Sequence, residues 1–397
     1  MSLPESTPAP AANAPANGPL NAGTAKAARA LTGVERAYRA GTDFFLGPLV
    51  DLMRDESVSE VMVNGPDAIY VERAGKIEKT AARFESERAL LAAANNIAQF
   101  VGRTISEQDP ILDGRLPDGS RVCVVLAPIA AAGTSINIRR FSRKAVSPEF
   151  LLQRKAITPE ALEFLLLCVA ASQNIIVSGG TGSGKTTLLN ILSTEFGGNE
   201  RIVVIEDTRE LQVQKEHVVQ MEARPADVHG RGLVTVRDLF ISALRMRPDR
   251  IVVGEVRRGE ALDMLQAMSS GHRGSLATLH ADTPAQACGR LETMCMMADS
   301  GLPLQALRRQ VGAAIDIVVQ AARLHDGRRL ITHISEIGLD EAANAYQVRD
   351  IYSLDTKAAL PELKWTGIKP KLAGELTWQG LDSRVRLTAA LFSGSMK

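Results

Sequence analysis

Residues Gly179–Thr187 read GGTGSGKTT and directly follow the strand-like run NIIVS at 174–178. The stretch fits the pattern G-x-x-x-x-G-K-[ST], whose glycines let backbone N–H groups surround a polyphosphate without Cβ clashes. The apolar segment TTLLNILS overlaps its end and predicts a helix whose N-terminus faces the same anion. This order of strand, loop and helix predicts a phosphate-binding loop. Its expected phosphate contacts are Gly179, Gly180, Thr181, Gly182, Ser183, Gly184, Lys185, Thr186 and Thr187.

Two side chains of this loop are expected to act on a nucleotide directly. Lys185 is in reach of the β- and γ-phosphates of ATP, and the Thr186 hydroxyl can ligate Mg²⁺. The alternative, a chance glycine-rich turn, is disfavoured because the complete pattern lies between a predicted strand and a predicted helix. The loop by itself indicates nucleotide binding, and hydrolysis requires further groups.

Strands and helices alternate around the loop. A helix is predicted over 159–171, with Thr158 as its N-cap and Pro159 at its first position. After Leu302 the pattern indicates a helical segment and then a hairpin between 329 and 352. The alternation predicts an α/β fold, a mostly parallel sheet with helices on both faces. Its strands are expected at Ile175–Ser178, Ile202–Glu206, Ile251–Gly254 and Ser275–Thr278.

Carboxylates follow two of these strands. RPDRIVVGEVR at 247–257 places Glu255 at the end of a buried strand, where it can hold the magnesium shell or polarise water. RIVVIEDTRE at 201–210 ends in Glu206, Asp207 and Glu210, which suit a general base or a water-orienting group. The alternative for Glu255 is a solvated side chain at the end of a strand. For at least one of the other three acids, the alternative is a place in a solvated turn capped by Asp207.

Histidines and arginines complete the candidate site. His272 and His280 flank the next predicted strand and suggest a γ-phosphate sensor or a switch relay. A metal site lacks a third ligand. Arg121 and Arg139 precede the nucleotide-binding core, and arginine suits the stabilisation of phosphoryl charge. Surface arginines paired with acids are the alternative for these two.

The segment before the core predicts a separate α+β domain. Within it, the run DGRLPDGSRV at 113–122 contains turns that could bring Arg115 and Arg121 close together. The first 30 residues are rich in Ala, Pro, Asn and Gly and are expected to be disordered. The expected division is a disordered or linker tail at 1–42, an α+β domain at 43–141, a linker at 142–158, and a RecA-like ATPase domain with a C-terminal helical segment at 159–397.

Composition limits the function classes. The net charge of the 397 residues is +1 and only 4% are aromatic, which disfavours direct binding of nucleic acid. The 4 cysteines form no C-x-x-C pair and are best interpreted as buried apolar residues in a reducing compartment. No apolar run approaches the roughly 20 residues of a membrane-spanning helix. We therefore expect a cytoplasmic protein without a transmembrane segment, for which any membrane role would come through a partner.

These motifs together resemble the type II/IV secretion ATPase superfamily. The order matches: a P-loop at 179–187, an Asp box at 201–210, a Walker B segment at 245–257 and a His box at 271–283. Runs at 59–77, 102–122 and 136–141 resemble the Tad or Flp pilus assembly branch, the CpaF-like ATPases. The tetracysteine zinc module of many pilus-extension and type II secretion ATPases is missing from the sequence, which disfavours those branches.

The resemblance implies a Mg²⁺-dependent ATPase that forms a homohexamer at the cytoplasmic face of the inner membrane. ATP would bind between the two domains, and the motor would drive membrane platform proteins to add or remove pilin subunits. By motif, Glu210 is the catalytic base, Glu255 the Walker B glutamate and His280 the histidine near the γ-phosphate, while Arg121 and Arg139 engage the nucleotide. The alternatives are an ATPase of type IV secretion or conjugative transfer, a nucleic-acid translocase, and a non-hydrolysing scaffold, which the acid set disfavours.

Overall fold

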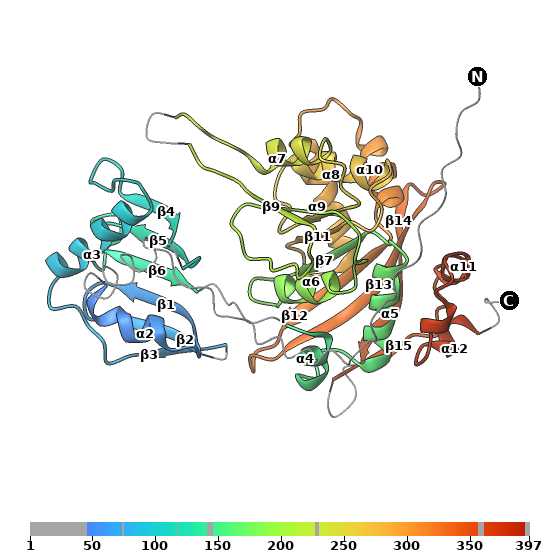
Figure 1. Cartoon of the computed structure of the whole chain (residues 1–397), viewed down its shortest axis with the longest axis horizontal. Coiled ribbons are helices and arrows are strands. Elements are labelled where there is room, and N and C mark those ends of the chain that lie inside the picture. The colour runs from blue at the N-terminus through green and yellow to red at the C-terminus, as the bar shows by residue number, and fades with distance from the viewer. Residues whose placement is uncertain are drawn as a thin grey trace, which may run out of the picture.

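The computed structural model describes residues 46–73, 75–116, 118–140, 146–226, 230–355 and 361–393. The predicted tail at 1–42 and the first residues of the predicted linker lie outside these ranges. The described residues form two sheets that follow one another along the chain (Figure 1). We call the part that carries the first sheet, residues 46–140, the first half of the chain, and the part that carries the second sheet, residues 146–393, the second half. The division into domains at 141 and 159 stays a prediction, and each sheet falls within one of its parts.

The first sheet is antiparallel throughout, with the strand order β3-β2-β1-β6-β5-β4. Helix α3 (Glu87–Phe100) begins where the Ser86 hydroxyl accepts the N–H of Ala89, and it buries Leu90 and Ile97 in the core of this half. A 3₁₀ turn (Gly47–Leu49) and α2 (Val50–Arg54) precede it. The strands are β1 (Val58–Asn64), β2 (Ile69–Arg73), β3 (Lys76–Lys79), β4 (Ile111–Arg115), β5 (Arg121–Val125) and β6 (Ser135–Arg139).

The second sheet has nine strands in the order β15-β14-β13-β12-β7-β11-β10-β8-β9. Neighbours from β12 to β9 pair in parallel, whereas β13, β14 and β15 extend the sheet in antiparallel fashion. The predicted α/β fold with a mostly parallel sheet is therefore confirmed. The strands are β7 (Ile175–Gly179), β8 (Ile202–Glu206), β9 (Val218–Glu222), β10 (Arg250–Val253), β11 (Leu276–Leu279), β12 (Ile317–Arg323), β13 (Arg329–Asp340), β14 (Ala345–Asp355) and β15 (Glu362–Trp365).

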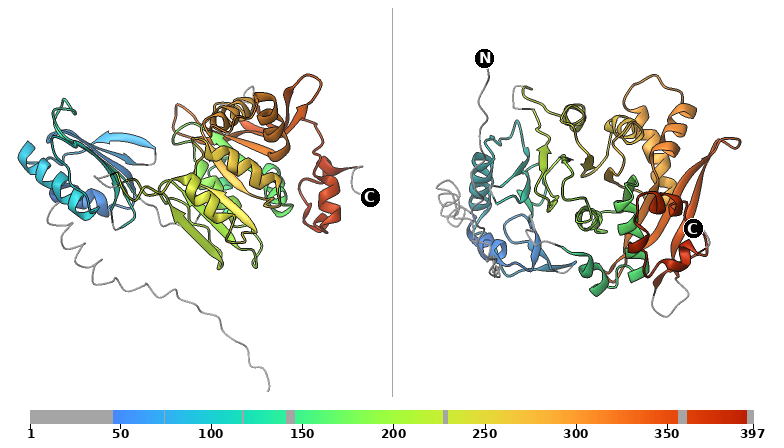
Figure 2. Two further views of the ribbon diagram at one scale, coloured as in Figure 1. Left: turned by 90° about the horizontal axis from the view of Figure 1, so that it is seen from above. Right: turned by 45° about the vertical axis from the view of Figure 1, so that its right-hand side comes forward.

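Helices cover both faces of the second sheet (Figures 1 and 2). Along β7, Ile175 and Val177 belong to one apolar cluster and Ile176 to the other, so the strand is apolar throughout. One cluster includes residues of α4 (Pro148–Gln153), α5 (Pro159–Ala170), α6 (Lys185–Ser193), α11 (Ala373–Trp378) and α12 (Ala389–Phe392), and a short 3₁₀ turn (Asp382–Arg384) lies between the last two helices. The other includes α7 (Val236–Ala243), α8 (Glu260–Ser269), α9 (Pro284–Met296) and α10 (Leu304–Ala314).

Three local expectations differ from the structure. Thr158 occupies the N-cap position of α5, but its hydroxyl donates to the carbonyl of Leu363 at 3.3 Å and caps no helical N–H. Strands β9 and β12 were not predicted, because short apolar runs cannot be separated from buried helical turns by periodicity. Strand β4 was not predicted either, and it covers the start of the run at 113–122, which was expected to contain turns.

The cysteines fit their predicted role as packing residues. Cys168, Cys288 and Cys295 are buried, Cys123 is half-buried, and all four are free thiols. Within the described ranges, no helix combines the length and apolar character that crossing a bilayer requires.

Candidate active site

The site lies at the carboxyl edge of the parallel strands. Strands β7, β11, β10 and β8 are neighbours, so the segments that follow them meet at one edge of the sheet. A cavity of about 280 Å³ opens there. It is lined by the P-loop residues 181–187 and by Arg121, Arg139, Glu206, Asp207, Thr208, Glu210, Gly254, Glu255, Arg257, Thr278, His280 and Arg329. The structure therefore brings together the acids, the histidine and the two arginines that were predicted to act with the loop.

The P-loop needs glycine for two different reasons. At Gly179 a Cβ atom would lie 2.2 Å from the carbonyl oxygen of Ala321 on the adjacent strand β12. Gly184 is the N-cap of α6 with φ of 97°, a left-handed conformation that favours glycine. Helix α6 starts at Lys185, and the first N–H groups of a helix have no carbonyl partner within it. The loop thus presents an anion-binding helix end to the cavity.

Lys185 and His280 connect the P-loop to Glu255. The Lys185 ammonium donates to the carbonyl oxygens of Gly179 and Gly180 at 2.9 and 3.0 Å, and it lies 3.5 Å from Nδ1 of His280. Nε2 of His280 lies 2.8 Å from Oε1 of Glu255. Burial and the nearby Lys185 charge lower the pKa of His280, so its ring is neutral at pH 7. With Lys185 beside Nδ1, the hydrogen of the neutral ring lies on Nε2, the nitrogen close to Glu255. Oε1 of Glu255 has no hydrogen-bond partner among the described residues, so the closeness of this ring is an electrostatic contact.

Glu255 is held from its other side by Arg257. Nη2 of Arg257 lies 2.7 Å from Oε2 of Glu255, and Nη1 lies 3.3 Å from Asp207. Burial acts to raise the pKa of Glu255, but the hydrogen bond and charge of Arg257, with His280 and Lys185, outweigh it and lower the pKa. Glu255 therefore stays ionised, as both predicted roles for it require.

Glu206 has a structural task that was not predicted. Its Oε1 accepts the backbone N–H groups of Glu210 and Leu211, each at 2.8 Å, and its side chain is buried. Burial raises the pKa of Glu206 to about 7, although the two backbone hydrogen bonds act in the opposite direction. Glu206 thus fixes the turn that presents Glu210, and its catalytic part stays a prediction.

Glu210 lies between the P-loop and the first half of the chain. Oε2 of Glu210 accepts the hydroxyl of Thr186 at 3.5 Å, and Oε1 lies 3.7 Å from Nη1 of Arg139. A carboxylate beside the P-loop threonine has the position that a magnesium or water-orienting group needs. Its role as the base stays a prediction.

Three arginines form a row across the first sheet. Arg115 pairs with Arg121 between β4 and β5, and Arg121 pairs with Arg139 between β5 and β6. Residues opposite each other share one face, so like charges there repel unless acids neutralise them. Arg121 forms an ion pair with Asp113 of the same sheet at 2.8 Å. Arg115 pairs with Glu222 and Arg139 with Glu210, both in the second half. The predicted closeness of Arg115 and Arg121 is confirmed.

His272 and His280 flank β11, as predicted, but of the two only His280 lines the cavity. Arg257 was within a quoted motif but had no assigned role. Arg329 lines the cavity from the start of β13, and its pKa is lowered by burial. Arg329 follows no motif, so no signal in the sequence could have placed it there.

A P-loop at the carboxyl edge of a parallel sheet defines a nucleotide-binding protein of the P-loop class. The family model described as "Type II/IV secretion system protein" matches residues 45–363. The chain belongs to this type II/IV secretion system family.

Individual relatives agree with this assignment. A putative conjugal transfer protein of Mycobacterium tuberculosis is 37% identical over 295 residues, which are 73% of this chain and 83% of that protein. The type IV secretion system protein VirB11 of Brucella suis is 33% identical over 336 residues, 77% of this chain and 92% of VirB11. The structure of the pilus retraction motor PilT with bound ADP shares the fold, with a TM-score of 0.52 and 20% identity, and the match covers 72% of this chain and 80% of PilT.

Proposed function

We propose that this protein is a Mg²⁺-dependent ATPase that hydrolyses ATP to ADP and phosphate. One observation carries the proposal: a single cavity joins the P-loop to Glu210, Glu255 and His280 from three neighbouring strands. Lys185 and the start of α6 would bind the phosphates. Glu210 would orient or deprotonate the attacking water, and the Lys185–His280–Glu255 chain would register the γ-phosphate.

The residues present fit a magnesium ion. Mg²⁺ is usually bound through one or two protein oxygens together with substrate phosphates. The Thr186 hydroxyl would hold the ion with the support of Glu255 or of Glu210, which already accepts a hydrogen bond from Thr186. When bound, the ion neutralises charge that develops on the phosphate oxygens.

We further propose that the protein works as a homohexameric motor on membrane platform proteins. Arg121 and Arg139 reach the P-loop cavity from the first half of the chain, so the site is complete only when both halves face each other. Hydrolysis would therefore alternate with movement of one half against the other. The resemblance of 59–77, 102–122 and 136–141 to CpaF-like ATPases supports a role in the assembly of a Tad or Flp pilus. The proposal extends to retraction of the same pilus.

A second candidate is a motor for type IV secretion or conjugative transfer at the inner membrane. The names of the relatives favour it, since they include VirB11 of Brucella suis and a putative conjugal transfer protein. Both candidates use the same ATPase chemistry and differ only in what is moved.

The two parts of the proposal need separate experiments. Purified protein should release phosphate from ATP when Mg²⁺ is present, and this release should stop when the ion is chelated. Phosphate release at the same rate without Mg²⁺ would contradict the enzymatic part of the proposal. For the branch, a strain with Lys185→Ala should lose surface pili in electron micrographs and keep protein secretion and conjugation. Normal pili with lost secretion or conjugation would favour the second candidate instead.

A further inference from the structure

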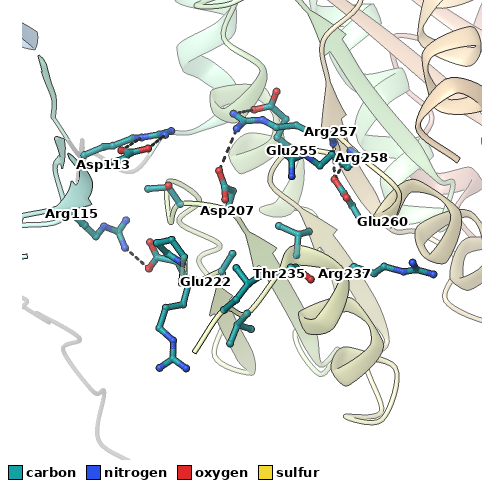
Figure 3. A pocket seen from close by; sticks show the side chains of 18 of the residues that line it. Asp113, Arg115, Asp207, Glu222, Thr235, Arg237, Glu255, Arg257, Arg258 and Glu260 are labelled. Atoms are coloured by element: carbon teal, nitrogen blue, oxygen red, sulfur yellow. Dashed lines mark hydrogen bonds and ion pairs between the residues drawn. The ribbon is translucent and has the colours of Figure 1, made fainter. Parts of the chain in front are cut away.

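A second and larger cavity, of about 610 Å³, adjoins the P-loop cavity between the two halves (Figure 3). The two cavities share Arg121, Asp207, Thr208, Glu255 and Arg257 in their walls. Arg115 lines the larger cavity and does not line the P-loop cavity. Arg115 nevertheless contacts the segment that carries Glu210.

The guanidinium of Arg115 is fixed at three nitrogen atoms. Its Nε donates to the carbonyl of Gly119 at 3.1 Å, a contact within the β4–β5 turn that sets its direction. Nη1 donates to Oε2 of Glu222 at 2.8 Å, and Nη2 donates to the carbonyl of Arg209. Figure 3 shows Arg115 reaching Glu222 from the first half of the chain. Only a planar fork supplies these three directions at once, so lysine cannot replace it.

Glu222 closes the arrangement from strand β9. Its Oε1 accepts the backbone N–H of Arg209 at 3.2 Å while its Oε2 holds Arg115. The peptide groups of Arg209 are therefore held through the N–H by Glu222 and through the carbonyl by Arg115. In the register of β8 and β9, Glu222 lies opposite Glu206, which holds the N–H of Glu210.

We infer that Arg115 is a positioning residue for ATP hydrolysis, because with Glu222 it clamps the Arg209 peptide and thereby places the carboxylate of Glu210. The inference rests on the proposed ATPase function. The clamp links one half of the chain to the other, so the Arg209 carbonyl is held only while β4 is docked against β9, whereas Glu206 holds the N–H of Glu210 from within the second half. An ordinary surface ion pair contributes little to stability. The Arg115–Glu222 pair differs from an ordinary surface ion pair because both side chains also form hydrogen bonds with the backbone of Arg209, next to Glu210.

The test compares Arg115→Ala, Arg115→Lys and Glu222→Gln with Arg237→Ala. Arg237 lines the same cavity, but its ion pair with Asp263, at 2.9 Å, lies wholly within the second half. We expect both Arg115 variants to lower kcat about tenfold, the equivalent of one charge-assisted hydrogen bond, with KM for ATP unchanged. Adding Glu222→Gln to Arg115→Ala should cost little more, because both changes open one clamp. Arg237→Ala should keep the wild-type kcat.

Amide hydrogen exchange supplies a readout that does not need catalysis. Exchange over residues 208–211 should be faster in Arg115→Ala and Glu222→Gln and unchanged in Arg237→Ala. Arg115→Lys keeps the charge and guards against loss of folding. Wild-type kcat in both Arg115 variants, or a raised KM at constant kcat, would overturn the inference while leaving the ATPase proposal intact. An inactive wild-type protein would count against the ATPase proposal, and the exchange measurement would still decide on the clamp.

Discussion

Nε2 of His280 lies 2.8 Å from Oε1 of Glu255, across the carboxyl edge of two adjacent parallel strands. The same ring lies 3.5 Å from the Lys185 ammonium through its other nitrogen. A neutral imidazole can accept from the lysine and keep its hydrogen on the side of the carboxylate, whereas a protonated ring would face the lysine with like charge. The P-loop and the Glu255 carboxylate are thereby connected by one titratable group.

Replacing His280 should impair hydrolysis and remove part of its pH dependence. Burial holds the pKa of His280 below its ordinary value, so the ring is neutral at pH 7 and protonates only in acid. Wild-type kcat should therefore fall in acid, at pH values below the ordinary pKa of histidine. His280→Gln should have a lower kcat at pH 7 and a flatter acid limb. An acid limb identical to that of the wild type would remove His280 from the account.

Glu210→Gln and Glu255→Gln should separate binding from hydrolysis. Both substitutions keep side-chain size and remove the charge, so phosphate contacts to the P-loop survive while water activation is lost. We expect kcat to fall about 100-fold or more with nucleotide affinity within about threefold, measured with a fluorescent ATP analogue. Glu216→Gln, an exposed position, serves as the control. Loss of nucleotide binding in both variants would contradict these roles.

The raised pKa of Glu206 should make the folded state less stable as the pH rises. Its pKa is raised from 4.5 to about 7 by burial, so the folded state binds a proton that the unfolded state releases. This contribution is fully present below about pH 4.5 and is lost as pH rises through about 7. Glu206→Gln keeps the Oε1 acceptor and cannot titrate. The unfolding temperature of the wild type should fall relative to Glu206→Gln between about pH 5 and pH 8; a constant difference would disprove the raised pKa.

Gly254→Ala should disturb the same carboxylate sterically. A Cβ atom at Gly254 would lie 2.8 Å from Cγ of Glu206, whose Oε1 is fixed by two backbone hydrogen bonds. We expect a loss of about 1–3 kcal/mol in the free energy of unfolding, together with a lower kcat. Gly198→Ala is the matched control, because a Cβ there meets no atom within 4 Å. Equal unfolding free energies for the two variants would show that the Glu206 turn tolerates movement.

The sequence predicted the parts of the site that local patterns encode. The P-loop, Glu210, Glu255 and His280 each follow an apolar strand, and parallel strands bring such positions to one edge. The order of the strands across the sheet then decides which of these positions are neighbours. Since a short apolar run has no decisive periodicity, β12 was missed, although its Ala321 carbonyl explains why Gly179 must be glycine.

Contacts between distant segments could not be predicted in the same way. Arg115 and Glu222 are 107 residues apart, and their pairing depends on how β4 of one sheet meets β9 of the other. Arg329 reaches the P-loop cavity because β13 pairs with β12 and β12 pairs with the distant P-loop strand β7, a long-range relationship without a sequence motif. The expected roles of Arg121 and Arg139 came from a resemblance, and the structure shows the row in which both lie.

The central claim is that the P-loop cavity hydrolyses ATP, and Lys185→Ala tests it most directly. Lys185 is the cation at the start of α6, whereas Lys76 on β3 is exposed and lies outside the cavity. Steady-state phosphate release should fall about 100-fold or more in Lys185→Ala and stay at the wild-type level in Lys76→Ala. Phosphate release at the wild-type rate in folded Lys185→Ala protein would contradict the account.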